Sequence, residues 1–467
     1  MEEGAVGGDR SGFVDLFFMV PRFLISAPKG MSGKTIVTLG VIYGLAKRGL
    51  RVAPFKVGPD FIDPTYHSWA SGRPGRNLDP VLMGEGGVLE RFVKYTVDVD
   101  IAVIEGVLGL YDSPDGVSEV GSTAQVAKLL KAPVVLVLNG DRVNRTLRAV
   151  VRGLKSFDPG VKIAGVVLTN VTSKQAEKIT KSLSEEGVEV FGAVLKSSAL
   201  ERAFEYRHLG LVPIDERGDT PTLADVLENY VVPYLDLDRL IDIARSAEPD
   251  GDFKQISEVT AAPGRRCKVG IVKDNAFTFY YPELIEEATF LGEPIFLKAS
   301  EGDFVDEVDL VIVGGGFPEV YAERLEKNKS FRKSLLKYIQ RGGRVYAECG
   351  GLMYLTSSIV IDRDEYEMVG AIDAVTILLR RPVGKGYVWG SVVRNTPVAP
   401  VGTKLLGHEF HYSKLIPRER LEPVIKLERG VGIGGGWDGV VKWNMHAQYM
   451  HIHPYTYNVL RYLCQYM

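Results

Sequence analysis

Cysteine is scarce in this sequence, since Cys267, Cys349 and Cys464 are the only three among 467 residues. Three widely separated cysteines are too few for a disulfide framework or for a cysteine metal cluster. A protein without a disulfide framework is typical of a reducing compartment, so we expect this protein to be cytoplasmic.

Charge of one sign is not in excess. Lys and Arg number 56, Asp and Glu number 59, and the formal net charge is −3. Binding to nucleic acid requires a basic face, so we expect no nucleic-acid partner.

Long hydrophobic runs are also missing. The apolar stretch at residues 13–24 is interrupted by Asp15, Pro21 and Arg22. It is too short to cross a bilayer, so we expect no membrane segment.

The chain is long enough for two or three domains, and strand-like runs alternate with helical stretches. In the first half these runs are residues 23–26, 52–57, 101–104, 134–138 and 163–168. This alternation predicts an α/β fold with a mainly parallel sheet.

A polar stretch without apolar periodicity separates two such regions, and alternation resumes at residues 269–272 and 308–313. We therefore expect two α/β domains in tandem. The predicted segments are a tail at 1–22, a first domain at 23–246, a linker at 247–266 and a second domain at 267–467.

A phosphate-binding loop is predicted after the first strand. Residues 26–35 have the sequence SAPKGMSGKT and precede a helix-like stretch. Backbone N–H groups would hold the phosphates, Lys34 would reach the terminal ones and the Thr35 hydroxyl would bind magnesium. Pro28 replaces the first glycine of the motif, but the flanking strand and helix argue against a chance match. The residues expected to bind ATP are Lys29, Gly30, Ser32, Gly33, Lys34 and Thr35.

Carboxylates follow two of the predicted strands. Glu105 ends one strand with Asp112 just beyond it, and Asp60 and Asp63 lie in a Gly-Pro loop after another. Such aspartates are by default solvated turn residues. Beside a phosphate loop, however, we expect a Mg²⁺ site made by Thr35, Asp60 and Glu105.

Cys349 is the candidate nucleophile. It follows a β-branched and aromatic run and precedes two glycines and an apolar helical stretch, the strand–turn–helix pattern that exposes a nucleophile. We expect the helix N-terminus to lower the pKa of its thiol. His451 and His453 would share one face of an extended segment, so one could be the base and the other its orienting partner.

These motifs together resemble the cobyrinic acid a,c-diamide synthase family. Its synthetase domain is matched in residues 23–246, through 58–64, His67, 72–74, 77–79, 105–112 and 121–124. Its glutaminase half is matched in residues 267–467, through 274–281, 314–319, 347–351, 407–413 and 451–453.

The resemblance implies both a fold and a reaction. The fold would be a P-loop NTPase domain of the dethiobiotin synthetase type followed by a class I glutamine amidotransferase domain. The reaction would use magnesium ATP to phosphorylate a tetrapyrrole carboxylate, and ammonia from glutamine would displace the phosphate. The a and c acetate groups would react in turn. Cobyrinate is the favoured substrate, nickel sirohydrochlorin is the alternative, and the enzyme could be a homodimer.

The resemblance also implies roles for single residues. Cys349 would attack glutamine with His451 as base and His453 or Glu348 as the partner that orients it. Backbone N–H groups of Gly315, Gly316 and Gly350 would hold the oxyanion. Glu105 and Thr35 fall at the magnesium positions. The positions associated with diamidation are Asp60, Ile62, Asp63 and Asp112. For His408 a substrate-pocket role and a structural role compete evenly.

A regulatory ATPase is the alternative from another class. Lys29 falls at the signature-lysine position of the partitioning and cell-division ATPases. Those proteins lack a glutaminase half, so Cys349 and His451 argue against this alternative.

Overall fold

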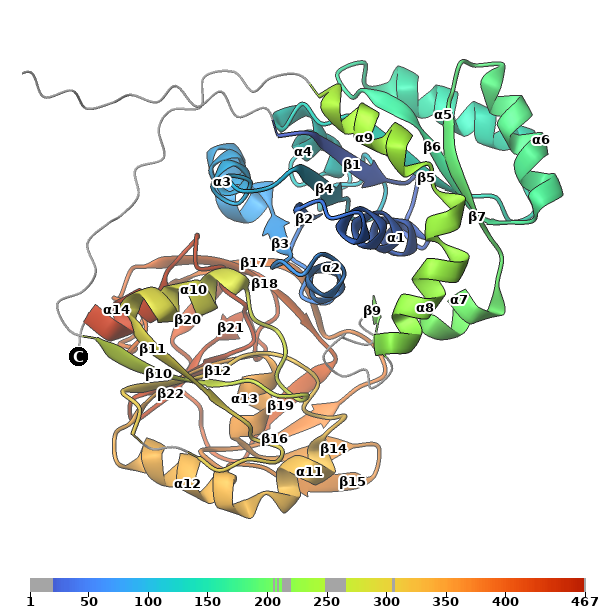
Figure 1. Ribbon diagram of the computed structural model, residues 1–467. Helices are drawn as coiled ribbons and strands as arrows, with labels where there is room; N and C mark the ends of the chain where they lie inside the picture. Colours follow the sequence, from blue (N-terminus) through green and yellow to red (C-terminus); the bar gives the residue numbers. More distant parts are fainter. Residues whose placement is uncertain are drawn as a thin grey trace, which may run out of the picture.

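The structure is a computed structural model, and it describes residues 20–204, 206–207, 210–211, 220–247, 266–304 and 307–465. The predicted tail, apart from its last residues, and nearly all of the predicted linker lie outside the described residues. Figure 1 shows two bodies, one built by the first half of the chain and one by the second.

The first domain is built on a seven-stranded parallel sheet, as predicted, with the order β3-β2-β4-β1-β5-β6-β7. Its strands are apolar and buried because helices cover both faces, and two apolar clusters fill the two sides. The strands are β1 Arg22–Ser26, β2 Val52–Val57, β3 Arg76–Leu78, β4 Ile101–Glu105, β5 Val134–Asn139, β6 Ile163–Val171 and β7 Val190–Leu195.

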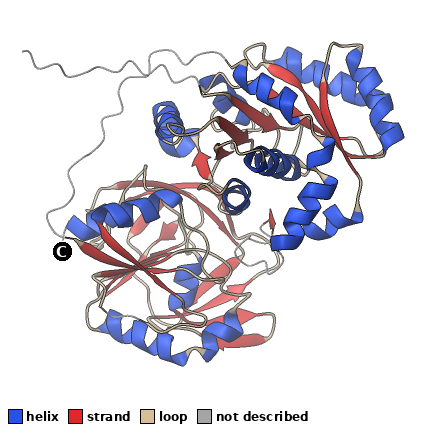
Figure 2. Cartoon of the chain, in the orientation of Figure 1, coloured by secondary structure: helices blue, strands red, loops and turns tan. Residues whose placement is uncertain are grey.

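The helices of this domain pack around the sheet, as Figure 2 shows. They are α1 Lys34–Lys47, α2 Asp63–Ser71, α3 Pro80–Lys94, α4 Thr123–Leu129, α5 Arg145–Phe157, α6 Ser173–Ser184, α7 Ser198–Ala203, α8 Thr220–Tyr230 and α9 Leu237–Arg245. A short 3₁₀ helix, η2 Val232–Tyr234, and the small pair β8 Tyr206–Arg207 and β9 Gly210–Leu211 complete it.

The second domain is built on a six-stranded sheet of order β11-β10-β12-β13-β23-β22, parallel except for its last pair. The strands are β10 Cys267–Val272, β11 Gly292–Leu297, β12 Leu310–Val313, β13 Arg344–Glu348, β22 Val440–Lys442 and β23 Met445–Gln448. The helices are α10 Pro282–Leu291, α11 Ala322–Lys327, α12 Lys329–Gln340, α13 Gly350–Leu355 and α14 Val459–Gln465.

Two further four-stranded sheets are inserted between α13 and β22, and the sequence did not indicate them. Their orders are β15-β14-β16-β19 and β18-β17-β20-β21. The strands are β14 Thr356–Ile361, β15 Asp364–Glu367, β16 Ile372–Leu378, β17 Gly384–Val392, β18 Lys404–His411, β19 Ser413–Pro417, β20 Ile425–Arg429 and β21 Trp437–Asp438.

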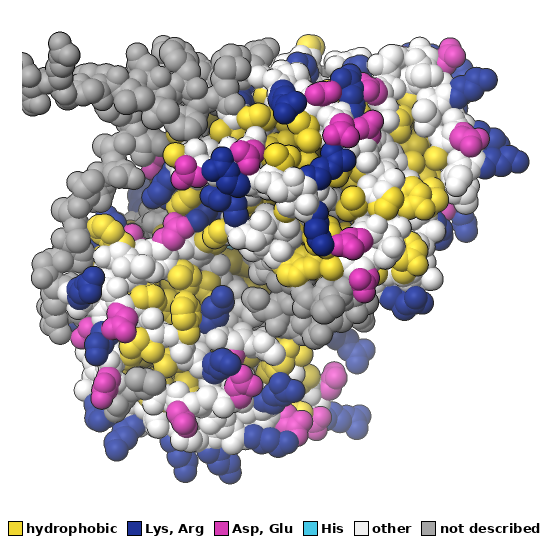
Figure 3. Space-filling model, in the orientation of Figure 1, with side chains coloured by type: hydrophobic (Ala, Val, Ile, Leu, Met, Phe, Trp, Pro, Cys, Tyr) yellow, Lys and Arg dark blue, Asp and Glu magenta, His cyan; other side chains and the backbone are white. Residues whose placement is uncertain are grey.

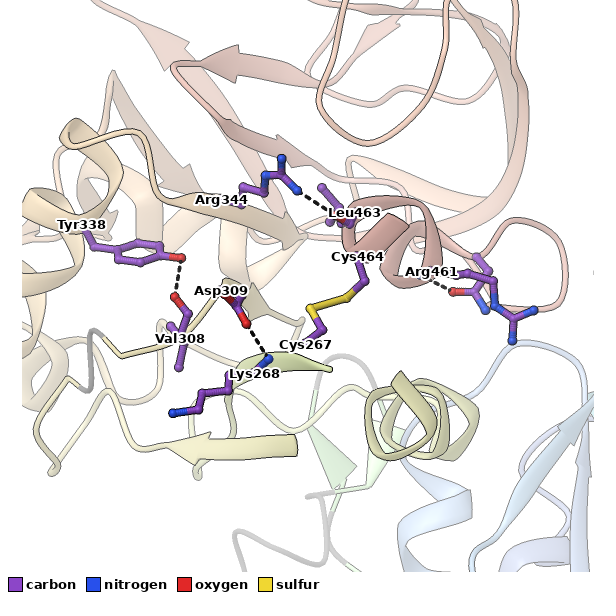
Figure 4. Close-up of a disulfide and its surroundings, with 10 residues drawn as sticks. Cys267, Lys268, Val308, Asp309, Tyr338, Arg344, Arg461, Leu463 and Cys464 are labelled. Carbon is purple, nitrogen blue, oxygen red and sulfur yellow. Dashed lines mark hydrogen bonds between the residues drawn. A yellow bond between two sulfur atoms is a disulfide. The ribbon is translucent and has the colours of Figure 1, made fainter. Parts of the chain in front are cut away.

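Two of the three cysteines form a disulfide, which their wide separation along the chain did not lead us to expect. Cys267, at the start of β10, and Cys464, in α14, form a disulfide although 197 residues separate them. Figure 4 shows this bond, with the nearby Arg344 side chain donating to the carbonyl of Leu463. The disulfide removes the argument for a reducing compartment that rested on few, scattered cysteines.

None of the helices in the described ranges is long and apolar enough to cross a membrane. On the described part of the face drawn in Figure 3, Lys and Arg side chains are mixed with Asp and Glu.

Candidate functional site

Cys349 occupies a sharp turn between β13 and α13, which confirms the predicted strand–turn–helix. Its φ is 48° and its ψ is −102°, a backbone conformation that non-glycine residues rarely adopt. Its N–H donates to the carbonyl of Gln448 at 2.8 Å. The parallel pairing of β13 with β23 thus fixes the cysteine beside the segment that leads to His451.

The Cys349 thiol is buried, with 5% of the residue exposed. Burial, followed by the nearby Glu319 carboxylate, raises the pKa of this thiol above its ordinary value. The prediction that the helix N-terminus lowers the pKa of Cys349 is therefore wrong. The helix α13 is only six residues long, and burial outweighs its effect. The thiol needs a base to remove its proton before it can attack.

Glu348 holds the ring of His451. The Nδ1 atom of His451 lies 3.1 Å from Oε2 of Glu348. The other carboxylate oxygen accepts hydrogen bonds from the N–H of Ile452 at 3.0 Å and the hydroxyl of Tyr346 at 2.5 Å. Of the two candidate orienting partners, Glu348 is the one that contacts His451.

His453 has different partners. Its Nδ1 accepts the N–H of Tyr455 at 3.0 Å, and its Nε2 lies 3.9 Å from Oε2 of Glu283. Burial lowers the pKa of His453 to about 4, so the ring is neutral near pH 7. A catalytic role for His453, which was one expectation, has no support in these contacts.

The predicted oxyanion glycines lie together. A Cβ placed on Gly315 would lie 2.6 Å from Cε1 of His451, and one placed on Gly350 would lie 3.1 Å from the nitrogen of Gly316. Glycine is needed here because a side chain would collide with the base or with the facing backbone.

His408 lies beside His451. The two residues exchange backbone hydrogen bonds of 3.0 and 2.8 Å, and their rings stack with centroids 5.1 Å apart. Burial, with smaller contributions from the two neighbouring histidines, places the pKa of His408 well below its ordinary value. These contacts describe a neutral residue that packs against His451, the candidate base.

The phosphate loop lies between β1 and α1, so the predicted context is confirmed. The Thr35 hydroxyl donates to Oε1 of Glu105 at 2.8 Å, and the Lys34 ammonium donates to the carbonyl of Leu108 at 2.5 Å. Burial, and then the charge of Lys56, lowers the pKa of Lys34 to about 8. Lys29 and Ser32 close the loop, because the Ser32 hydroxyl donates to the Lys29 carbonyl at 3.0 Å.

Lys56 was missed by the sequence analysis. Its ammonium lies 2.5 Å from Asp63, 3.0 Å from Glu105 and 3.9 Å from Asp60. Burial alone would lower the pKa of Lys56, but the charges of Asp63 and Glu105 outweigh it and raise that pKa. The available signal was a lysine inside a buried strand, since such lysines are almost always paired.

His67 also belongs to this cluster, although the sequence analysis assigned it no role beyond its part in the resemblance. Its Nε2 lies 2.7 Å from Oε2 of Glu105, and both side chains are buried. Burial alone would raise the pKa of Glu105, but Lys56 and His67 hold it well below its ordinary value. Glu105 is therefore a carboxylate over the whole neutral range.

The predicted aspartates have distinct partners. Asp60 accepts the backbone N–H groups of Ile62 at 2.8 Å and Asp63 at 3.1 Å, so it shapes its own loop. Asp112 accepts the N–H of Gly109 at 2.7 Å and likewise closes a turn. Ile62 is buried. Asp63 alone of these aspartates forms a short ion pair with Lys56.

The oxygen donors around Thr35 and Glu105 suit Mg²⁺, which binds proteins through few carboxylates and completes its shell with water and phosphate. Asp60 lies outside this pair, with one carboxylate oxygen bonded to its own loop. No group of three or more His, Cys, Asp and Glu side chains within the described residues has metal-binding geometry. Thr35 and Glu105 are the residues that could hold a Mg²⁺ ion together with nucleotide phosphates.

A cavity of about 340 Å³ adjoins the phosphate loop, at the carboxyl ends of β5, β6 and β7. Asn139, Asn170 and Lys196 line it together with Ser32 and Gly33. Ligands of parallel α/β sheets bind at this edge, so the cavity is a candidate nucleoside pocket. Residues from three separate strand ends form it, which is why the sequence analysis missed it.

The two domains meet through buried polar contacts. Arg76 of β3 donates to Glu283 at 3.1 Å, and the hydroxyl of Tyr387 in β17 contacts both carboxylate oxygens of Asp79, at 3.0 and 3.2 Å. The loop after β2 also enters the interface, where it places Phe61 on the ring of His451 with centroids 5.1 Å apart.

Two domain families match this chain, one in each half. A CobQ/CobB/MinD/ParA nucleotide binding domain matches residues 23–210. A CobB/CobQ-like glutamine amidotransferase domain matches residues 268–458.

Several curated relatives match nearly the full length. The cobyrinate a,c-diamide synthase of Archaeoglobus fulgidus is 40% identical over 437 residues, 93% of this chain and 94% of the relative. Synthases of the same name are 38% identical in Methanosarcina barkeri, over 94% of both chains, and 38% identical in Listeria monocytogenes, over 93% of this chain and 96% of the relative.

Proposed function

The chain belongs to the cobyrinate a,c-diamide synthase family, a family of glutamine-hydrolysing carbon–nitrogen ligases, and on this premise we propose that it amidates the a and c acetate carboxylates of cobyrinate with ATP and glutamine. The observation that carries the proposal is the presence of two different sites on one chain. One is Cys349, which directly follows Glu348, the carboxylate that contacts His451, and the other is a phosphate loop bonded to Glu105.

Ammonia release would take place at Cys349. His451, oriented by Glu348, would take the thiol proton, and the sulfur would attack the amide carbon of glutamine. N–H groups of Gly316 and Gly350 would stabilise the oxyanion, and its collapse would give a thioester and ammonia. Water would then hydrolyse the thioester to glutamate and regenerate the thiol.

Carboxylate activation would take place at the phosphate loop. A substrate carboxylate oxygen would attack the γ-phosphorus of ATP, which gives an acyl phosphate and ADP. Lys34 would neutralise charge on the transferred group, and Thr35 and Glu105 would hold Mg²⁺, which supplies charge neutralisation when it is bound. Ammonia would then attack the acyl carbon, and phosphate would leave with the amide formed.

The acceptor is tested by a paired assay. Purified protein is incubated with ATP, Mg²⁺, glutamine and either cobyrinate or nickel sirohydrochlorin, and products are followed by mass spectrometry. The proposal expects successive monoamide and diamide from cobyrinate at a higher kcat/KM than from nickel sirohydrochlorin. Amidation of nickel sirohydrochlorin alone would overturn the assignment of the acceptor.

A regulatory ATPase of the partitioning type predicts another result. Its ATP hydrolysis would be stimulated by DNA or lipid, whereas here ADP is expected to form in equal amount with the amide. We propose a cytoplasmic location, in keeping with a biosynthetic enzyme of this family.

A further inference from the structure

One aromatic side chain of the synthetase domain reaches the glutaminase site. Phe61 lies in the loop between β2 and α2, and its ring contacts four rings that all belong to the second domain. The partners and centroid distances are Phe279 at 5.3 Å, Tyr281 at 4.5 Å, His408 at 5.4 Å and His451 at 5.1 Å.

The Phe61 ring touches both parts of the glutaminase machinery. It lies on His451, the candidate base, and it stacks on Phe279 with an interplanar angle of 6°. Phe279 in turn donates its N–H to the carbonyl of Gly315 at 3.0 Å, and its ring approaches the same glycine. A shift of Phe61 would therefore change the packing of both His451 and the loop that contains Gly315.

The other end of the Phe61 loop is fixed to the nucleotide site. Asp60 accepts the N–H groups of Ile62 and Asp63, and the Asn77 amide donates to the carbonyls of Gly58 at 2.7 Å and Asp60 at 2.8 Å. These bonds make the loop a rigid unit, since its backbone is held from both sides of Phe61.

The Asp63 end of this loop is bonded to the phosphate loop through two side chains. Asp63 pairs with Lys56, Lys56 bonds to Glu105 at 3.0 Å, and Glu105 accepts the Thr35 hydroxyl. A cation that arrives with nucleotide at Thr35 and Glu105 would compete with the Lys56 ammonium for the same carboxylate oxygen. Displacement of Lys56 would move Asp63 and, through the rigid loop, Phe61.

Phe61 also borders the space between the domains. Together with Asp60, Asn77 and Thr278 it lines a cavity of about 740 Å³. A ring fixed only by apolar packing would need no connection to carboxylates of the nucleotide site. Here contacts run from Thr35 through Glu105, Lys56 and Asp63 to the loop that carries Phe61, and from the Phe61 ring to His451.

We propose that Phe61 is a positioning residue that makes the glutaminase base respond to nucleotide at the phosphate loop. The inference rests on the proposed function of the two sites, but it does not depend on the identity of the tetrapyrrole. With nucleotide bound, the ring would hold His451 in the orientation that deprotonates Cys349. Without nucleotide, the base would be less well placed and glutamine hydrolysis slower.

The test measures glutamine hydrolysis with and without a non-hydrolysable ATP analogue and Mg²⁺, with no tetrapyrrole present. Coupling between two ligand sites typically changes affinity by roughly 5- to 150-fold, so wild-type hydrolysis should rise by at least about 5-fold. In Phe61→Ala and Phe61→Leu the stimulation should fall to near unity, and Phe61→Tyr, which keeps the ring, should recover it. The rate of Cys349 alkylation, followed by intact-mass measurement, should also change when the analogue is added to the wild type or to Phe61→Tyr. It should not change in Phe61→Ala or Phe61→Leu.

Tyr387→Phe is the matched control, because it removes a hydrogen bond between the domains but keeps the ring that lies opposite His408 on the neighbouring strand. It should leave the stimulation as in the wild type. Melting temperatures identify a variant that fails to fold, and Phe61→Leu then stands in for Phe61→Ala.

Three results would overturn the inference: unchanged stimulation in both Phe61→Ala and Phe61→Leu, loss of stimulation in Tyr387→Phe, or a wild-type enzyme that shows none. Failure of the proposed function is a separate result, namely absence of tetrapyrrole amidation with either glutamine or ammonium chloride in the wild type.

Discussion

His451 Nδ1 lies 3.1 Å from the carboxylate of Glu348, the residue directly before the candidate nucleophile. Glu348 is the last residue of β13 and Cys349 follows it directly, whereas His451, the candidate base, comes from the segment after β23. The carboxylate is held by the hydroxyl of Tyr346 and the N–H of Ile452, so the imidazole has one preferred orientation.

Replacing Glu348 tests this arrangement. Glu348→Gln keeps the shape but can favour the wrong tautomer of His451, and loss of an orienting carboxylate in a comparable triad costs about 10⁴-fold in kcat. We expect glutamine-dependent activity to fall by about 10²-fold or more, with ammonium-dependent amidation retained. His453→Gln is the comparison and should affect hydrolysis much less. Equal losses in the two variants would contradict the assignment of Glu348.

The nucleotide site is tested by Lys34→Ala and Glu105→Gln. Each removes a charge that acts on the transferred phosphoryl group or its cation, so amidation should fall by about 100-fold or more with either nitrogen source. Lys47→Ala, at an exposed position near the end of the same helix α1, should behave as the wild type. Near-normal turnover in both site variants, measured by ADP release and amide formation, would place ATP elsewhere.

Asp79 should make stability depend on pH. Burial raises the pKa of Asp79 to about 6, whereas an unfolded aspartate titrates near about 4. Between these values the folded state keeps a proton that the unfolded state loses, so the free energy of unfolding should fall as pH rises through this window. The free energy of unfolding at pH 7 should therefore be lower by about 3 kcal/mol than it would be without this shift.

Asp79 caps α3, because its carboxylate accepts the N–H groups of Val81 and Leu82. Asp79→Asn should remove that slope, because asparagine caps a helix as well as aspartate does but carries no charge. Urea unfolding of both proteins at pH 4 to 8 gives the difference in free energy. The buried Asp438, whose pKa burial also raises to about 6, is present in both proteins and cancels. A difference that does not vary with pH would show that Asp79 titrates alike in both states.

The disulfide between Cys267 and Cys464 should stabilise the second domain without taking part in catalysis. It closes a loop of 197 residues, and disulfides typically contribute about 2–4 kcal/mol. Cys267→Ser should therefore lower the melting temperature while kcat is retained. Reductant should lower the wild-type melting temperature to that of the variant and leave the variant unchanged. An unaltered melting temperature after the bond is opened would contradict this.

The parallel sheet of the first domain and the phosphate loop were predictable because their signals are local. Each strand there is a short apolar run, and the residues of the loop follow one another along the chain. The turn at Cys349 was predictable for the same reason, since the two glycines after it permit the sharp change of direction.

The full sets of partners around Glu105 and Phe61 were not predictable, because they join residues that are distant along the chain. Glu105 is bonded by Thr35, Lys56 and His67, which come from α1, β2 and α2. Phe61 was an unremarkable aromatic residue in an acidic loop until the second domain supplied its partners. The two four-stranded sheets after α13 were not predicted as sheets, although residues 407–413, which carry part of the resemblance, span the end of β18 and the start of β19.

The central claim is that one chain divides the reaction between a thiol site that releases ammonia and a phosphate-loop site that consumes it. Cys349→Ser tests it most directly, with amidation of cobyrinate measured by mass spectrometry with glutamine and then with ammonium chloride. We predict loss of glutamine-dependent amidation and near wild-type amidation with ammonium chloride, accompanied by ADP in equal amount. Loss of both activities in a folded variant would contradict the account.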